Sequence, residues 1–212
     1  MQTRKVIGSI GAAAVLGSVL LGSVAFAAAP TTAPGQNKLQ CFDGTTDGGY
    51  GGTCTLNSSG AKGSATLALN SSNVNGDYAG VYTLESKLYG TTLGKITQLS
   101  YQYSGTRAAT PGSLSLNVPV NTSGGTATDA YLFIDAYYCP GTGGMVDVIN
   151  DPNCGIYYNG SVFYPNWAAV VAAYPNAKIA TDNYAFIVAE RTPTEAAVVW
   201  TVNNVKFGKA GK

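Results

Sequence analysis

The sequence predicts an all-β protein: a jelly-roll-like antiparallel β-sandwich with one short helix at about residues 166–174 and two disulfide-closed loops. Short segments in which apolar and polar residues alternate recur along the chain, and turns rich in Gly, Pro, Asn and Asp separate them. Charged residues make up only 11% of the chain. The long loops and the single helix favour a jelly roll over a small immunoglobulin-like domain.

Residues 1–27 have the pattern of a secretory signal peptide. Arg4 and Lys5 precede an apolar stretch rich in small residues, and Ala25-Phe26-Ala27 matches a cleavage site. We expect cleavage after Ala27, so that the mature chain is secreted, extracellular or at the cell surface, and has no membrane span. An uncleaved anchor is the alternative, because the stretch is long enough to cross a bilayer.

Three further regions follow the signal peptide. We expect a flexible leader and a first cysteine loop over 28–62, the β-sandwich over 63–208, and a tail over 209–212. Cleavage removes two of the 12 basic residues, which leaves 10 against 11 acidic ones. With no basic patch to bind phosphates, we expect no nucleic-acid partner.

The β-strands are expected where the alternation is clearest. The expected ranges are 64–69, 78–84, 96–103, 114–120, 131–138, 145–149, 155–158, 184–189 and 197–207. A β-bulge near Asn203-Asn204 would return Val205 and Phe207 to the core face. The helix is predicted by apolar residues at helical spacing from Trp167 onward, with Asn166 as its N-cap.

The four cysteines allow three disulfide pairings. We favour Cys41–Cys54 and Cys139–Cys154, since each closes a short loop and export supplies an oxidising compartment. Other pairings would bring the N-terminal loop against the 139–154 loop. The rival interpretation, a four-cysteine zinc site, does not fit the spacing of zinc knuckles.

The chain contains no histidine, which excludes Ser–His–Asp and Cys–His nucleophilic sites and His-containing zinc sites. The remaining catalytic chemistry is that of carboxylates, as in glycosidases, or that of a Lys/Tyr-based lyase. If the protein is an enzyme, the candidates are Glu85 and Glu190, at the ends of predicted strands, and Asp135, within the most apolar strand. The alternative is that they are solvated strand ends and a half-buried structural acid.

Aromatic residues gather around the second cysteine loop, and they are the candidate ligand-binding residues. They are Tyr137, Tyr138, Tyr157, Tyr158, Tyr164 and Trp167. Exposed rings beside Asn and Asp suit glycans, because a ring covers the apolar face of a sugar while polar side chains bind its hydroxyls. The alternative is that these rings fill the core.

The same loop carries four oxygen-bearing side chains that could hold Ca²⁺: Asp147, Asn150, Asp151 and Asn153. Their spacing does not match an EF-hand, and Asp and Asn are also common turn formers. No other cofactor is expected.

Three segments carry a resemblance to known proteins. Asn166-Trp-Ala-Ala, Asp147-Val-Ile-Asn-Asp-Pro-Asn-Cys154 and Val202-Asn-Asn-Val-Lys-Phe-Gly208 resemble secreted β-sandwich proteins of Gram-positive bacteria, especially actinobacteria. The resemblance covers about residues 75–208. It implies a secreted jelly-roll-like sandwich and no catalytic residue.

Three functions fit the sequence. The first is a non-enzymatic extracellular module that binds a glycan or another cell-envelope ligand. The second is a structural or adhesive envelope protein without a small ligand. The third is a carboxylate-dependent carbohydrate-active enzyme.

Overall fold

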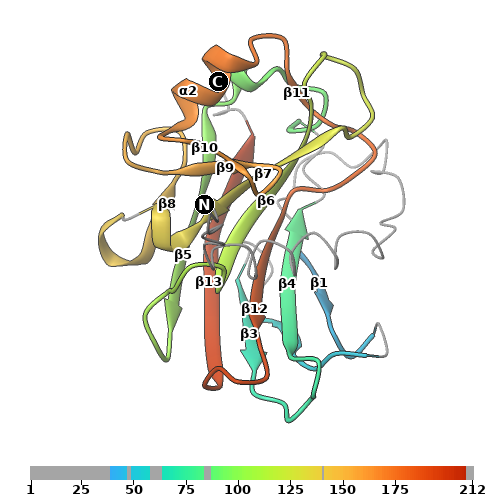
Figure 1. The fold of residues 1–212 in the computed structure, drawn as a ribbon, viewed down its shortest axis with the longest axis vertical. Helices are drawn as coiled ribbons and strands as arrows, with labels where there is room; N and C mark the ends of the chain where they lie inside the picture. The colour runs from blue at the N-terminus through green and yellow to red at the C-terminus, as the bar shows by residue number, and fades with distance from the viewer. Residues whose placement is uncertain (1–38, 47–48, 58–63, 84–86, 140, 209–212) are drawn as a thin grey trace, which may run out of the picture.

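The computed structural model describes residues 39–46, 49–57, 64–83, 87–139 and 141–208. The predicted signal peptide, most of the leader, the tail and Glu85 lie outside these residues. Within them, the chain is almost entirely β-structure (Figure 1).

The strands are short and follow one another closely. They are β1 (Leu39–Asp43), β2 (Thr53–Leu56), β3 (Ala65–Leu69), β4 (Asp77–Thr83), β5 (Gln98–Gly105), β6 (Leu114–Asn121), β7 (Ala130–Asp135), β8 (Met145–Asp147), β9 (Ile156–Tyr158), β10 (Val162–Tyr164), β11 (Lys178–Ile179), β12 (Phe186–Arg191) and β13 (Val198–Gly208). The helices are α2 (Trp167–Ala173) and the 3-10 turns η1 (Leu93–Lys95), η2 (Ala136–Tyr138) and η3 (Thr142–Gly144).

The strands form two antiparallel sheets. Sheet A has the order β1-β4-β12-β6-β7-β9-β10, with β11 paired to β6, and sheet B has the order β2-β3-β13-β5-β8. Eight of these strands pair from the chain ends inward: β3 with β13, β4 with β12, β5 with β8, and β6 with β7. That nesting is the topology of a jelly roll, so the predicted fold class is confirmed.

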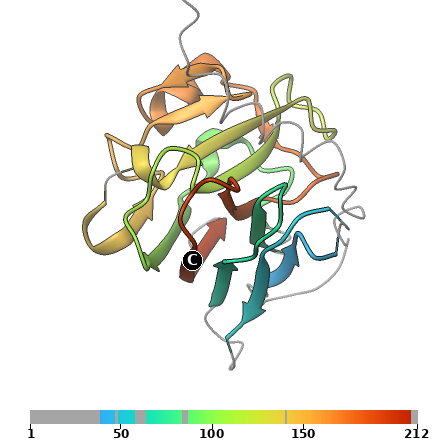
Figure 2. The same cartoon turned by 60° about the horizontal axis from the view of Figure 1, so that its bottom comes forward.

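The main core lies between the two sheets (Figure 2). Alternation places Leu114, Leu116 and Val118 of β6 on the inner face of sheet A, and Trp200 and Val202 of β13 on that of sheet B; all are fully buried. Burying each such aliphatic side chain contributes roughly 1.5–3 kcal/mol. The inner faces of both sheets are therefore filled by core packing. On sheet A, only the outer face can make other contacts.

The last strand contains the predicted bulge. The pairing of β13 with β5 shifts register between Asn203 and Lys206, and Asn204 has a φ of 51°. The extra residue restores the alternation, because Val205 and Phe207 are buried in the core after it. The sequence-based prediction of this bulge is confirmed.

Helix α2 lies at one end of the sandwich, close to β10 (Figure 1). The Asn166 side chain accepts a hydrogen bond from the amide of Ala169 at 3.0 Å, which confirms it as the N-cap. Trp167 and Val170 are buried on the face toward the core. The helix ends before Tyr174, one residue earlier than the predicted range.

Both expected disulfides are present, Cys41–Cys54 and Cys139–Cys154. The first joins β1 to β2, which extend the two sheets by pairing with β4 and β3. The described sandwich thus includes β1 and β2, which lie before the expected boundary of 63. The predicted strand over 131–138 also ends early, at Asp135. The Asp135 carboxylate accepts a hydrogen bond from the Tyr137 amide and caps a 3-10 turn.

Candidate binding surface

The outer face of sheet A is lined with aromatic side chains. In the antiparallel register, the outward positions on neighbouring strands line up into a cross-strand row that runs from β4 to β10. The row consists of Tyr82, Phe186, Asn117, Phe133, Tyr157 and Phe163. Five of its six members are aromatic; Phe186 is buried, Tyr82, Phe133 and Tyr157 are partly buried, and Phe163 is exposed.

At the β9–β10 edge, four rings form a cluster with solvent-exposed members. We name Tyr137, Tyr138, Tyr157 and Phe163 the edge cluster. Its ring centroids are 5.0 Å apart for Tyr137–Tyr138, 5.7 Å for Tyr138–Tyr157 and 5.1 Å for Tyr157–Phe163. Tyr137 is 51% exposed and Phe163 is 50% exposed. Exposed aromatic surface of this kind marks an interaction site more often than isolated apolar residues do.

The second disulfide positions this cluster. Cys139 follows Tyr138 directly, and Cys154 precedes Gly155, whose amide donates to the Tyr138 carbonyl at 2.8 Å. A Cβ added at Gly155 would lie 2.6 Å from the ring of Phe163. The Phe163 ring therefore lies directly against the Gly155 backbone, and a side chain at this position would displace it.

The opposite half of the face is more closely packed. Tyr78, Phe186 and Val188 are buried there beneath partly buried rings that include Phe42 and Tyr131. Phe42 contacts Phe186 edge-on with centroids 5.7 Å apart. Burial raises the pKa of Tyr131 to about 12, with a further contribution from Asp182, so its hydroxyl is a neutral donor and acceptor at physiological pH.

A polar lane lies between Phe186 of β12 and Phe133 of β7, and Tyr131, whose ring contacts both, joins the two aromatic groups at its end. The polar lane consists of the outward residues Ser115 and Asn117 of β6, which lie between β12 and β7. The Asn117 amide nitrogen donates to the Ser115 hydroxyl at 3.1 Å. Asn117 is 2% exposed, and within the described residues its Oδ1 has no hydrogen-bond partner.

Two carboxylic acids, Asp135 of β7 and Glu190 of β12, occupy outward positions on the strands that flank the polar lane. Burial raises the pKa of Asp135, while hydrogen bonds from the amides of Gly112 and Tyr137 oppose that shift. Burial raises the pKa of Glu190 to about 7. Strand spacing and rise place the two Cα atoms about 12 Å apart, because they lie two strands and two residues from each other. Glu85, the third acidic candidate, lies outside the described residues.

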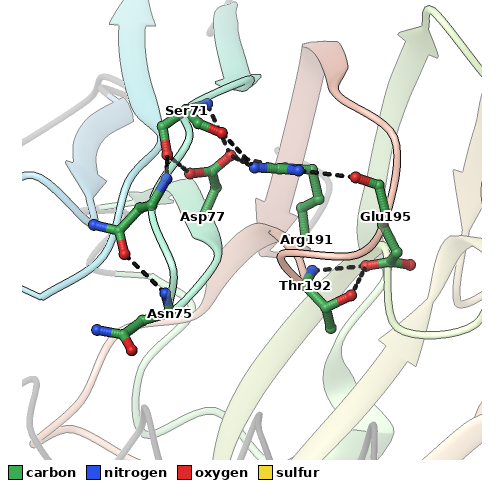
Figure 3. A network of polar contacts seen from close by, with 7 residues as sticks. Ser71, Asn75, Asp77, Arg191, Thr192 and Glu195 are labelled. Carbon is green, nitrogen blue, oxygen red and sulfur yellow. Dashed lines mark hydrogen bonds and ion pairs between the residues drawn. The ribbon is translucent and has the colours of Figure 1, made fainter.

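A buried ion pair joins β4 to β12 and fixes the register of these two strands next to Glu190 (Figure 3). Arg191 contacts Asp77 with an N–O distance of 2.7 Å, and both side chains are almost fully buried. The guanidinium also donates to the Ser71 and Glu195 carbonyls at 2.7 and 2.8 Å. Because Asp77 and Arg191 are paired across β4 and β12, their neighbours Tyr78 and Glu190 stand side by side on the outer face. The separation of 114 positions in the sequence hid this pair from sequence analysis.

The structure separates the predicted aromatic residues into two groups. Tyr137, Tyr138 and Tyr157 lie in the edge cluster. The other three face the core side of the same region. Trp167 is 5% exposed, and Tyr158 stacks on Tyr174 at 5.0 Å.

Tyr164 donates from its hydroxyl to that of Tyr174 at 3.2 Å and also packs against the core. The expectation that Tyr158, Tyr164 and Trp167 offer rings to a ligand therefore needs correction, because strand alternation and the helix turn them inward. The sequence analysis did not identify Phe133 and Phe163 as candidate ligand-binding residues. The alternation in 131–138 could have revealed Phe133, whereas β10 was not predicted.

The residues considered for Ca²⁺ form turns. The Asp147 carboxylate accepts from the Asn150 amide nitrogen at 3.0 Å, and Asp151 accepts from the backbone amide of Asn153 at 2.9 Å. The second of these is the hydrogen bond of an Asx turn, and the first joins two side chains within the same loop. In the described part of the chain, no group of three or more His, Cys, Asp or Glu side chains gathers at one point.

Comparisons with known proteins give limited further information. No family model matches the sequence, and no curated protein matches it. Among solved structures, the chain is similar to the family 11 carbohydrate-binding module of the cellulosomal cellulase Lic26A-Cel5E of Clostridium thermocellum. The identity is 11%, 84% of this chain and 91% of that chain are covered, and the TM-score is 0.35. At these values the similarity identifies neither a family nor a ligand.

The fold and the surface together define a class: a disulfide-bonded jelly-roll β-sandwich with an aromatic outer sheet face. Within the described residues, none of the helices combines the length and apolar character needed to cross a bilayer.

Proposed function

We propose that this protein is a secreted, non-enzymatic binding module that holds a glycan chain on the outer face of sheet A. The observation that carries the proposal is the edge cluster, where Tyr137 and Phe163 expose about half of their surface at the end of an aromatic row. The exposed rings at this edge offer flat platforms for the apolar faces of sugar units.

The mixture of rings and polar groups favours a glycan over a purely adhesive protein contact. Protein-binding patches are depleted of polar groups at their centre. Here the centre of the face contains Ser115 and Asn117. A hydroxyl-rich ligand can donate to Asn117 Oδ1, which has no hydrogen-bond partner within the described residues, whereas an apolar partner would leave it unpaired.

The test is a glycan screen on the mature protein, with and without Ca²⁺, followed by titration of the best oligosaccharide. We expect Phe163→Ala and Tyr157→Ala each to weaken binding at least tenfold or so, because truncating a central aromatic contact commonly has that effect. Val74→Ala is the matched control, since Val74 is 84% exposed and lies in the β3–β4 loop. If no glycan binds under either condition, the proposal is wrong.

A carboxylate-dependent enzyme is the second candidate, and one observation favours it. The raised pKa of Glu190, about 7, is suited to a general acid near neutral pH. Incubating the mature protein with the glycans that bind and measuring new reducing ends tests this function. Turnover that Glu190→Gln abolishes would establish it, and no turnover with any bound glycan would exclude it.

A further inference from the structure

Asn117 has a hydrogen-bond acceptor without a partner within the described residues, and a ligand on the outer face of sheet A would supply the donor. Asn117 lies in the middle of the cross-strand row, between Phe186 on β12 and Phe133 on β7. One end of its amide is satisfied by Ser115, while Oδ1 has no partner among the described residues. Buried polar atoms are nearly always hydrogen-bonded, so an unpaired one needs an explanation.

Near the polar lane the charges on this face are of one sign, although β11, which also belongs to sheet A, carries Lys178. The outward positions of β1, β4, β12, β6, β7, β9 and β10 hold Asp135 and Glu190, and none of them holds Lys or Arg. Lys178 of β11 is paired with Asn121 of β6, at the end of β6 that lies far from Asp135 and Glu190. Arg191 is engaged inside by Asp77. An anionic sugar in the lane would therefore meet two carboxylates without a neighbouring cation.

Resting on the glycan-binding function proposed above, we propose that the polar lane makes this face selective for neutral glycans. Asn117 is the specificity-determining residue, and its Oδ1 accepts a hydrogen bond from one sugar hydroxyl. Asp135 and Glu190 disfavour uronic acids. Phe133 is only partly buried beside Asn117, and its ring turns aside when the ligand enters.

The geometry assigns the parts of the face different roles. The edge cluster supplies affinity through its exposed rings, and any pyranose with an apolar face can stack there. The polar lane selects among glycans, because a site that hydrogen-bonds a particular hydroxyl discriminates strongly against an analogue without that hydroxyl. The two roles can be separated by mutation, since Phe163 and Asn117 lie three strands apart.

The first experiment uses the wild-type protein with two classes of probe. Neutral cello-, xylo- and manno-oligosaccharides and oligogalacturonate are titrated at pH 8 in low and in moderate salt. We expect a neutral probe to bind at least tenfold more tightly than oligogalacturonate in low salt, with a smaller difference when salt screens the carboxylates. Equal or tighter binding of oligogalacturonate would overturn the selectivity.

The second experiment combines Asn117→Leu with monodeoxy analogues of the neutral probe that binds. In the wild type, removing one particular hydroxyl should weaken binding roughly tenfold, and in Asn117→Leu the same removal should cost nothing. Asn176→Leu, an exposed position after α2, is the matched control. If Asn117→Leu folds and binds every analogue as the wild type does, Asn117 has no role in specificity.

The outcomes separate the two proposals. Should Phe163→Ala abolish binding while Asn117→Leu has no effect, the glycan-binding function stands and the specificity role fails. Should the wild type bind no glycan, both fail. If Asn117→Leu does not fold, the deoxy series on the wild-type protein decides, because the absence of any sensitive hydroxyl then contradicts the role of Asn117.

Discussion

Replacing Glu190 with Gln should make the protein more stable above neutral pH. Glu190 stands at an outward position of β12, beside Tyr78 of β4. Burial raises its pKa from 4.5 to about 7. The folded protein therefore binds the proton more tightly than the unfolded chain does. Since one pKa unit corresponds to 1.36 kcal/mol, ionised Glu190 destabilises the fold by about 3 kcal/mol.

The sign of the pH dependence follows from proton binding. Between pH 4.5 and 7 the folded state holds more protons than the unfolded state, so the free energy of unfolding falls as pH rises and levels off above pH 7. Asp135, whose pKa is also raised, adds to the same trend. Glutamine at position 190 cannot ionise and removes the larger contribution.

Urea unfolding at pH 4 and pH 8 measures the effect. We expect the two proteins to agree at pH 4, and the variant to be more stable by about 3 kcal/mol at pH 8, with unchanged denaturant slopes. An identical pH dependence in wild type and variant would refute the reasoning, because it would show that the Glu190 carboxyl is solvated in the folded protein.

Three further changes probe the parts that hold the surface in place. Arg191→Met should cost 3–5 kcal/mol or so in urea unfolding, because it leaves Asp77 buried without its partner; a loss below about 1 kcal/mol would contradict the burial of that pair. Replacing Cys139 and Cys154 by Ser should lower the unfolding free energy by about 3 kcal/mol, and glycan affinity should fall with it if the disulfide positions the edge cluster. Asn166→Ala should cost about 1 kcal/mol through loss of the N-cap, and thermal unfolding that does not change would argue against that hydrogen bond.

Local patterns in the sequence predicted much of the fold. Alternation predicted most of the strands that form the jelly roll, because one face of each strand is buried and the other is not. The bulge at Asn203-Asn204 was predictable for the same reason, since Val205 and Phe207 return to the core only if one residue is inserted. The strands that escaped prediction, β1, β2, β10 and β11, are short or lie in Gly-rich segments, where pairing with a neighbour decides the conformation.

The sequence by itself determined the compartment expected for this protein, its disulfides and the catalytic chemistry it lacks, since each depends on which residues are present or on their spacing. Only the tertiary structure decided which rings face outward. Tyr157 and Tyr158 are adjacent in sequence, yet one joins the edge cluster and the other stacks inside on Tyr174. The cross-strand row and the Arg191–Asp77 pair join residues that lie far apart in the chain. Their positions depend on strand register, which no local pattern contains.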